Sequence, residues 1–291
     1  MKKGVTDMYD LTIIGTGPAG ISAALTAKAR NLNFLWLGSS ALSSKIEKAE
    51  RIMNYPGLLS VSGKDMSDIF KKQIDDSGIE ITNAQANAIY DMGSHYTVSA
   101  SSEFYETKTI IIATGMATAK VIDGEERLLG NGVSYCATCD GALYKGKTIA
   151  VVCTDKNFEE EIEFLSKTAS DIHLFTTYKE PIIKASNIEH YVGIPDSVNG
   201  SLRVESVTYK NSVIPVNGVF FLKESVNPKV LLSGLAMENN HIIVNRDCET
   251  NMHGVYAAGD CTGLPYQYTK ATGEGNIAVH SVLKYLKENK E

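Results

Sequence analysis

The sequence predicts an α/β protein with two three-layer domains, and three observations support this. The chain has 291 residues, which is enough for two domains of about 150 residues each. Near the amino end, an apolar run, a glycine turn, an alanine-rich segment and a second apolar run follow one another. The same strand, helix, strand order returns at residues 148–152, 157–168 and 172–175. Such alternation is typical of parallel sheets covered by helices on both faces.

Composition and charge exclude several classes of protein. Apolar residues make up 43% of the chain and charged residues 21%, which excludes a long disordered or fibrous segment. The net charge of -6 offers no basic surface for phosphates, so no nucleic-acid partner is expected. No apolar run is long enough to span a bilayer, and polar residues follow Met1-Lys2-Lys3 where a signal peptide would be apolar. We therefore expect a cytoplasmic protein with no membrane partner.

The first predicted strand, residues 9–14, ends in the turn Gly15-Thr16-Gly17-Pro18-Ala19-Gly20, and a helical segment follows to Arg30. Glycine is needed where the backbone turns at Gly15, approaches a pyrophosphate at Gly17 and packs helix against strand at Gly20. The helix start then offers free N–H groups to the phosphates. The segment predicts a dinucleotide site, although a purely structural turn would carry the same glycines.

Three further strands contribute to the predicted site. The strand at 33–37 ends in Gly38-Ser39-Ser40, without the acidic residue that holds the ribose in a plain NAD site. Another strand ends in Ala113-Thr114-Gly115, and a third ends in Gly259-Asp260 before a helix that runs to about Lys287. Open parallel sheets bind ligands beyond the carboxyl ends of their strands, so these ends are expected to converge on one extended dinucleotide. The alternative is that Asp260 only caps a helix and Thr114 only belongs to a turn.

These segments, with Asn54-Tyr55-Pro56-Gly57 between them, resemble the low-molecular-weight thioredoxin reductases along nearly the whole chain. The resemblance implies two Rossmann-like domains and a homodimer. An FAD-binding domain would comprise residues 1–117 and 247–291, with a second domain, 118–246, inserted between hinges near 116–120 and 244–248. By similarity, the residues along FAD would be Gly15, Gly17, Pro18, Ala19, Gly20, Gly38, Asn54, Thr114, Gly115, Gly259, Asp260 and Gln267.

The inserted segment carries a pair of cysteines, Cys136 and Cys139, separated by two residues. On a first helical turn this spacing brings the thiols to disulfide distance, and a helix start lowers a thiol pKa. Zinc would need a second pair of ligands, but Cys153, Cys248 and Cys261 are isolated, so no metal is expected. Those three cysteines are expected to be free and buried. The pair therefore predicts redox chemistry.

The segment Cys136-Ala137-Thr138-Cys139-Asp140 is also similar to the redox segment of thioredoxin reductases. The resemblance implies that Cys139 faces the flavin and that Cys136 attacks the partner's disulfide through a mixed disulfide. Asp140 would return a proton to the leaving thiolate. The inserted domain would have to swing, because one dithiol cannot reach both the flavin and a protein partner at once.

The inserted domain lacks the features with which the family binds NADPH. No glycine lies between Gly146 and Gly193, and no arginine lies between Arg127 and Arg203. The predicted helix instead opens with carboxylates at the positive end of its dipole, which would repel phosphates. These carboxylates are Asp155, Glu159, Glu160, Glu161 and Glu163. No NAD(P)H binding is therefore expected.

This departure resembles the ferredoxin-dependent flavin thioredoxin reductases, the branch of the family that is independent of pyridine nucleotides. The resemblance implies that electrons pass from reduced ferredoxin through FAD and the dithiol to thioredoxin. Candidate basic spots for an acidic donor are Lys45, Lys48 and Arg51, or Lys71 and Lys72, with solvated surface charge as the alternative. Three alternative functions are also consistent with the sequence: a flavin dithiol oxidase that uses oxygen, a thioredoxin reductase with an atypical NADPH site, and a non-enzymatic redox sensor.

Overall fold

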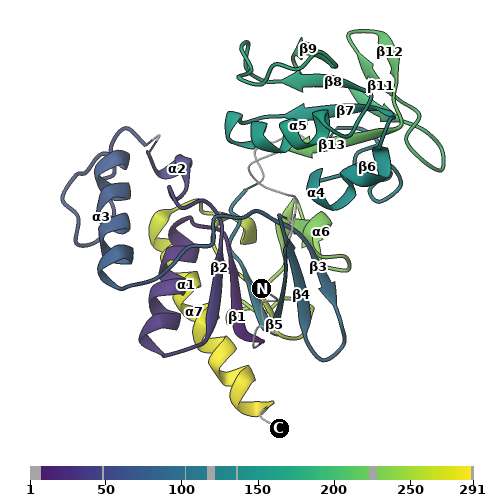
Figure 1. Cartoon of the computed structure of the whole chain (residues 1–291). Helices are drawn as coiled ribbons and strands as arrows, with labels where there is room; N and C mark the ends of the chain where they lie inside the picture. The colour runs from purple at the N-terminus through teal and green to yellow at the C-terminus, as the bar shows by residue number, and fades with distance from the viewer. Residues whose placement is uncertain are drawn as a thin grey trace, which may run out of the picture. The chain divides into compact units, whose positions relative to one another are not determined.

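A computed structural model of the chain describes residues 8–47, 49–101, 103–116, 122–135, 137–222 and 228–289, without the side chains of residues 44, 45, 138, 139 and 157. The chain divides into two compact units (Figure 1). Unit 1 comprises residues 1–117 and 227–291, and unit 2 comprises residues 118–226. Each unit contains helices and a sheet with parallel strands, so the predicted α/β class is confirmed.

Unit 1 is built on a six-stranded sheet with the order β2-β1-β5-β4-β3, in which β16 also pairs with β5. Its strands are β1 (Tyr9–Ile14), β2 (Phe34–Leu37), β3 (Ala86–Asp91), β4 (Tyr96–Ala100), β5 (Glu103–Ile112) and β16 (Val255–Ala257). The first half of β5 is antiparallel to β4, and its second half is parallel to both β1 and β16. Ile14 and Ala257 both pair with Ile112, so strands from the two ends of the sequence finish together.

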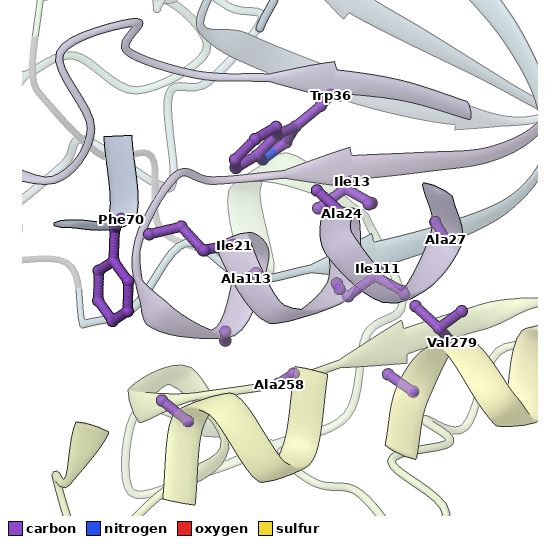
Figure 2. Close-up of a cluster of buried hydrophobic side chains, with 14 of the residues drawn as sticks. Ile13, Ile21, Ala24, Ala27, Trp36, Phe70, Ile111, Ala113, Ala258 and Val279 are labelled. Atoms are coloured by element: carbon purple, nitrogen blue, oxygen red, sulfur yellow. The ribbon is translucent and has the colours of Figure 1, made fainter. Parts of the chain in front are cut away.

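The longest helix of unit 1 packs along its first helix (Figure 1). The helices and short elements are α1 (Pro18–Ala29), α2 (Ser44–Glu47), α3 (Gly63–Asp76), α6 (Pro228–Leu231), η3 (Asp260–Thr262), α7 (Tyr268–Glu288) and the hairpin of β14 (Met237–Glu238) and β15 (His241–Ile242). Figure 2 shows part of the core, in which Ala24 and Ala27 of α1 belong to one buried cluster with Val279 of α7. No helix in the described ranges is both long and apolar enough to cross a bilayer.

Unit 2 has a five-stranded parallel sheet with the order β6-β13-β7-β8-β9 and a separate three-stranded sheet. Its elements are β6 (Val133–Ser134), α4 (Ala137–Asp140), η1 (Gly141–Tyr144), β7 (Thr148–Cys153), η2 (Lys156–Phe158), α5 (Glu159–Ser166), β8 (Asp171–Thr176), β9 (Ile188–Val192), β10 (Ser197–Asn199), β11 (Ser206–Tyr209), β12 (Ser212–Pro215) and β13 (Gly218–Leu222). Ile162 and Leu165 of α5 pack with Val151 of β7 in one buried cluster.

The second boundary between the units differs from the expected one. It falls after residue 226 rather than after 246, because α6 contacts β3 and Leu232 pairs with Ile89 of that strand. The expected hinge at 244–248 is an internal turn of unit 1, closed by the Cys248 N–H group, which donates to the Asn245 carbonyl at 3.1 Å. Of the other expected hinge, 116–120, only Met116 lies among the described residues.

Candidate functional site

The turn after β1 has a shape that only glycine allows at two positions. Gly15 has a φ of +114°, and a Cβ atom there would lie 2.3 Å from the Ala113 carbonyl oxygen. A Cβ atom at Gly20 would lie 1.9 Å from the Gly15 carbonyl oxygen. The Trp36 indole N–H also donates to that oxygen, at 2.9 Å. A Cβ atom at Gly17, in contrast, would meet no atom within 4 Å, so the turn exposes open space there.

Helix α1 begins at this open space. Gly17 is its N-cap residue, Pro18 its first residue, and neither a capping side chain nor an acidic residue occupies its first turn. The first amides of a helix, here including those of Ala19 and Gly20, have no acceptor within the helix and carry the positive end of its dipole. The start of α1 is therefore suited to bind an anion.

The carboxyl end of β5 lies directly beside the turn. The Ala113 N–H group donates to the Ile14 carbonyl at 2.8 Å. The hydroxyl of Thr114, the next residue, is buried and has no hydrogen-bond partner within the described part of the chain. A buried hydroxyl without a partner costs free energy, which a ligand that hydrogen-bonds it recovers. Gly115 follows with a φ of +65° and open space at its Cβ position.

The end of β16 completes the arrangement that the sequence predicts. The Ala258 N–H group donates to the Ile112 carbonyl at 3.0 Å. A Cβ atom at Gly259 would lie 3.0 Å from the Cβ atom of Ala19, so Gly259 packs against the first turn of α1. Asp260 is half-buried and begins η3. The strand ends that carry Gly15, Thr114 and Asp260 are thus adjacent in space.

Three more residues of the predicted site, Asn54, Gln267 and Gly38, lie outside these three strand ends. The Asn54 amide N–H group donates to the Gln267 side-chain oxygen at 2.8 Å, although the two residues are 213 positions apart. Both side chains are exposed, and Gln267 is the N-cap residue of α7. Gly38 follows β2, where a Cβ atom would lie 2.8 Å from the Thr16 methyl group.

A partly buried network under the Asp260 loop was missed by the sequence analysis. The Lys270 ammonium group donates to the carbonyl oxygens of Gly259 and Gly263 at 2.9 and 2.7 Å, and to the Thr262 hydroxyl at 2.8 Å. The Glu274 carboxylate accepts from the Gly259 N–H group at 2.8 Å and lies 3.3 Å from Lys270. The pair therefore fixes the loop that carries Asp260. Its spacing of four residues was visible in the sequence, but the loop that it holds was not.

The predicted dithiol is only partly described. Cys136 lies outside the described residues, and of Cys139 only the backbone, in α4, is described. Beside them, Tyr135 is buried and its hydroxyl donates to the Glu125 carboxylate. Burial and the Glu125 charge raise the pKa of Tyr135 well above its usual value. Asp140 is half-buried at the end of α4. The roles of Cys136, Cys139 and Asp140 stay predictions.

The carboxyl end of β7 is filled by the protein's own side chains. Cys153 is fully buried there, and its thiol donates to the Asp155 carbonyl at 3.1 Å. The Tyr178 hydroxyl donates to the Cys153 sulfur at 3.4 Å, and the Lys156 ammonium group lies 5.4 Å from the centre of the Tyr178 ring. Glu159, the first residue of α5, is buried and accepts the N–H groups of residues 182 and 183, each at 2.7 Å.

One of the two candidate basic spots is locally neutralised. Lys71 and Lys72 of α3 form ion pairs with Asp75 and Asp76, each four residues further along the helix. In the other spot, the Arg51 guanidinium group donates to the Ser60 hydroxyl at 2.5 Å. The described residues include neither Lys48 nor the side chain of Lys45.

Thiol labelling should separate the five cysteines into two groups. Burial raises the pKa of the Cys153 thiol to about 11 and those of Cys248 and Cys261 to about 12. Because only thiolates react with Ellman's reagent, we expect two fast thiols at pH 8 in the native reduced protein. All five should react after unfolding in guanidinium. A third fast thiol in the native protein would contradict this assignment.

Comparison with known proteins gives consistent matches along the chain. Residues 9–153 and 195–275 match the family described as pyridine nucleotide-disulphide oxidoreductase. The unmatched stretch contains α5, β8 and β9. Thioredoxin reductases from Listeria monocytogenes and Bacillus subtilis are 33% and 30% identical to this chain, over 98% of it and 96% of each relative.

Two solved structures extend the comparison. A ferredoxin-flavin thioredoxin reductase from Clostridium acetobutylicum is 42% identical, with a TM-score of 0.89 over 97% of this chain and 99% of that one. A thioredoxin reductase from Gloeobacter violaceus is 27% identical, with a TM-score of 0.78 over 97% of this chain and 95% of that one.

Proposed function

Because the chain belongs to the thioredoxin reductases of the pyridine nucleotide-disulphide oxidoreductase family, we propose that it uses ferredoxin as its electron donor. Electrons would pass from reduced ferredoxin through FAD and the Cys136/Cys139 dithiol to the disulfide of thioredoxin. The choice of donor depends on one observation. Protein side chains fill the carboxyl end of β7, where a pyridine nucleotide would otherwise bind.

The site at the three strand ends of unit 1 fits FAD. The start of α1 and the open space at Gly17 suit the pyrophosphate. The Thr114 hydroxyl, which has no partner among the described residues, and the half-buried Asp260 suit polar groups along the dinucleotide. The remaining residues proposed to hold it are Gly15, Pro18, Ala19, Gly20, Gly38, Asn54, Gly115, Gly259 and Gln267. When bound, FAD supplies a carrier that exchanges single electrons with one partner and an electron pair with a dithiol.

Replacing Thr114 with valine should change the stability of the apoprotein and its affinity for FAD in opposite directions. The apoprotein should become about 1 kcal/mol more stable, because a buried hydroxyl without a partner is removed. Affinity for FAD should fall roughly tenfold, because a hydrogen bond to the ligand is lost. Urea unfolding and FAD fluorescence titration measure the two effects. The matched control is Thr12→Val, since the Thr12 hydroxyl in β1 is also buried, has no partner in the described ranges and lies within the sheet. Unchanged FAD affinity in Thr114→Val would contradict the site.

In unit 2, the proposed roles follow the family resemblance. Cys136 would attack a sulfur of the thioredoxin disulfide, and Cys139 would then displace thioredoxin from the mixed disulfide and close the Cys136–Cys139 bond. Asp140 would give its proton to the leaving thiolate. Reduction of the Cys136–Cys139 bond by the electron pair held in unit 1 would return the dithiol to its starting state.

A pyridine nucleotide site at β7 is disfavoured on both charge and space. Cys153, Tyr178 and the buried Glu159 occupy the region beyond β7 where a pyrophosphate would lie. Glu159, Glu160 and Glu161 fill the first turn of α5 with negative charge. The family match is interrupted over this same stretch, 154–194. The proposal is therefore that the enzyme does not use NAD(P)H, and the 42% identity to a ferredoxin-flavin thioredoxin reductase supports ferredoxin in its place.

Anaerobic titration of the purified holoenzyme tests the proposal. Reduced ferredoxin should bleach the flavin absorbance, and oxidised thioredoxin should restore it. NADPH and NADH should leave the spectrum unchanged. Rapid bleaching by NADPH would overturn the choice of donor. Rapid oxygen consumption with a small dithiol, without thioredoxin reduction, would instead identify a dithiol oxidase.

The proposal also includes a homodimer that works in the cytoplasm. Both follow from the family resemblance, and a reducing compartment suits an enzyme whose dithiol must return to the reduced state. Sedimentation equilibrium of the holoenzyme should give twice the mass of the chain. A monomer at micromolar concentration would contradict this part of the proposal.

A further inference from the structure

The loop between β16 and α7 that carries Asp260 is held by one ammonium group. The Lys270 Nζ atom donates to the Gly259 carbonyl at 2.9 Å and to the Gly263 carbonyl at 2.7 Å. Its third N–H group donates to the Thr262 hydroxyl at 2.8 Å. The Lys270 side chain is only 17% exposed. A single, largely buried group therefore binds the backbone on both sides of Asp260.

Helix stability does not explain why Lys270 stands at this place. It is the third residue of α7, where the helix dipole is positive and a positive charge is unfavourable. Its partner Glu274, at 3.3 Å, follows four residues later, and a pair with the acidic residue second is the weaker order for a helix. The lysine is instead explained by what it binds outside the helix, which is the Asp260 loop.

The backbone of the Asp260 loop does not fix its own shape. Gly259 and Gly263 have φ values of +90° and +117°. Glycine adopts positive and negative φ about equally well, so these two residues do not favour the observed shape over others. The Glu274 carboxylate adds a further contact, because it accepts the Gly259 N–H group at 2.8 Å. The side chains of α7 therefore determine where the loop lies.

The same helix also fixes the position of α1. The Ser22 hydroxyl of α1 donates to the Thr272 carbonyl of α7 at 2.6 Å, and the Asn276 amide of α7 donates to the Thr26 hydroxyl at 3.0 Å. Helix α7 thus connects the two parts of the proposed FAD site, the start of α1 and the Asp260 loop. Lys270 makes most of the side-chain hydrogen bonds between α7 and the second part.

We propose that Lys270 is a positioning residue for FAD, which sets where Asp260 meets the dinucleotide by holding the loop on both sides of it. All three N–H groups of Lys270 are bound to the loop, so none is left for a ligand. Its effect on FAD therefore passes through the Asp260 carboxylate. This inference rests on the proposed FAD site of unit 1 and adds to it a residue that does not touch the cofactor.

The test is a double-mutant cycle on FAD affinity, measured by flavin fluorescence during titration of the full-length apoprotein. Lys270→Met and Asp260→Asn should each weaken FAD binding by roughly tenfold, since each removes the contact with Asp260. In the double variant the two losses should not multiply, because Lys270 acts through Asp260. The matched control is Lys284→Met on the same helix, which is exposed and should change the affinity by less than about twofold.

Two further measurements separate positioning from loss of structure. Lys270→Arg keeps the positive charge beside Glu274 and so protects the fold, but its planar guanidinium group cannot replace one nitrogen atom that three oxygens surround. It should also weaken FAD binding, and only in the presence of Asp260. At saturating FAD, the visible circular dichroism of the flavin in Lys270→Met should change in the same way as in Asp260→Asn.

Three results would overturn the inference: losses that multiply in the double variant, wild-type FAD affinity in both Lys270 variants, or a flavin spectrum of Lys270→Met that superposes on that of the wild type. Wild-type protein that binds no FAD would overturn the proposed cofactor site, and this inference with it. Because the titration needs neither ferredoxin nor thioredoxin, a wrong electron donor leaves its result unaffected.

Discussion

Replacing Cys139 with serine is expected to abolish thioredoxin reduction, by at least about 10³-fold, and to leave Cys136 able to capture thioredoxin. The proposed roles differ for the two cysteines: Cys136 forms the mixed disulfide and Cys139 resolves it. Without Cys139 the mixed disulfide has no resolving thiol in the enzyme. Cys136→Ser should abolish turnover to the same extent but should form no mixed disulfide.

A thioredoxin with a single active-site cysteine, linked to thionitrobenzoate, makes this difference measurable. Thiolate attack by Cys136 forms the enzyme–thioredoxin disulfide and releases one thionitrobenzoate anion, which absorbs at visible wavelengths. Cys139→Ser should release one equivalent and give a covalent complex on a non-reducing gel. Cys136→Ser should release little and give no complex. The reverse result would exchange the two roles, and complex formation by both variants would show that either cysteine can attack.

Adding one methyl group at Gly275 should destabilise unit 1 by about 3 kcal/mol, because helix α7 has no room for it. A Cβ atom there would lie 2.1 Å from the Ala19 carbonyl oxygen of α1. Backbone atoms cannot give way at such a distance unless the two helices move apart. Since Ala19 belongs to the proposed FAD site, affinity for FAD should fall as well.

The matched control for Gly275→Ala lies two residues earlier in the same helix. A Cβ atom at Gly273 would meet nothing within 4 Å. Gly273→Ala should therefore stabilise unit 1 by roughly 0.5–1 kcal/mol, since alanine restricts the unfolded chain more than glycine does. Trp36, the single tryptophan, lies in the core of unit 1, so its fluorescence during urea unfolding reports on that unit. Equal effects of the two substitutions would contradict the close packing of α1 and α7.

The parts of the fold with a strong local pattern could be predicted from the sequence. The apolar runs at 9–14 and 148–152 correspond to β1 and β7, and the helix expected at 157–168 corresponds to η2 and α5. The unit boundary at 226 could not be predicted, because α6 and the β14–β15 hairpin are too short to show a period. Only their contacts with the rest of unit 1 reveal where they belong.

The residues of the candidate site were also predictable only in part. Glycine positions such as Gly15 and Gly20 were predictable, because a tight turn before a helix restricts the residue type. The carboxylates of α5 were predictable as a charged helix start, but Glu159 binds the backbone amides of residues 182 and 183. Those amides are distant in sequence, so no spacing rule identifies them. Pairs such as Lys270 and Glu274 are visible in the sequence, whereas the loop that they hold depends on the tertiary fold.

Strand β5 pairs with β1 from the start of the sequence and with β16 from its end. This arrangement affects the order in which the parts of the chain fold during translation. Unit 2 is continuous in sequence, so the ribosome finishes it while β16 and α7 are still unmade. Until then, the second half of β5 has no neighbour on the side that β16 will occupy, and α1 lacks the helix that covers it. The nascent enzyme therefore completes its inserted unit first and carries an open strand edge, the kind that invites pairing with other chains, until its last segment emerges.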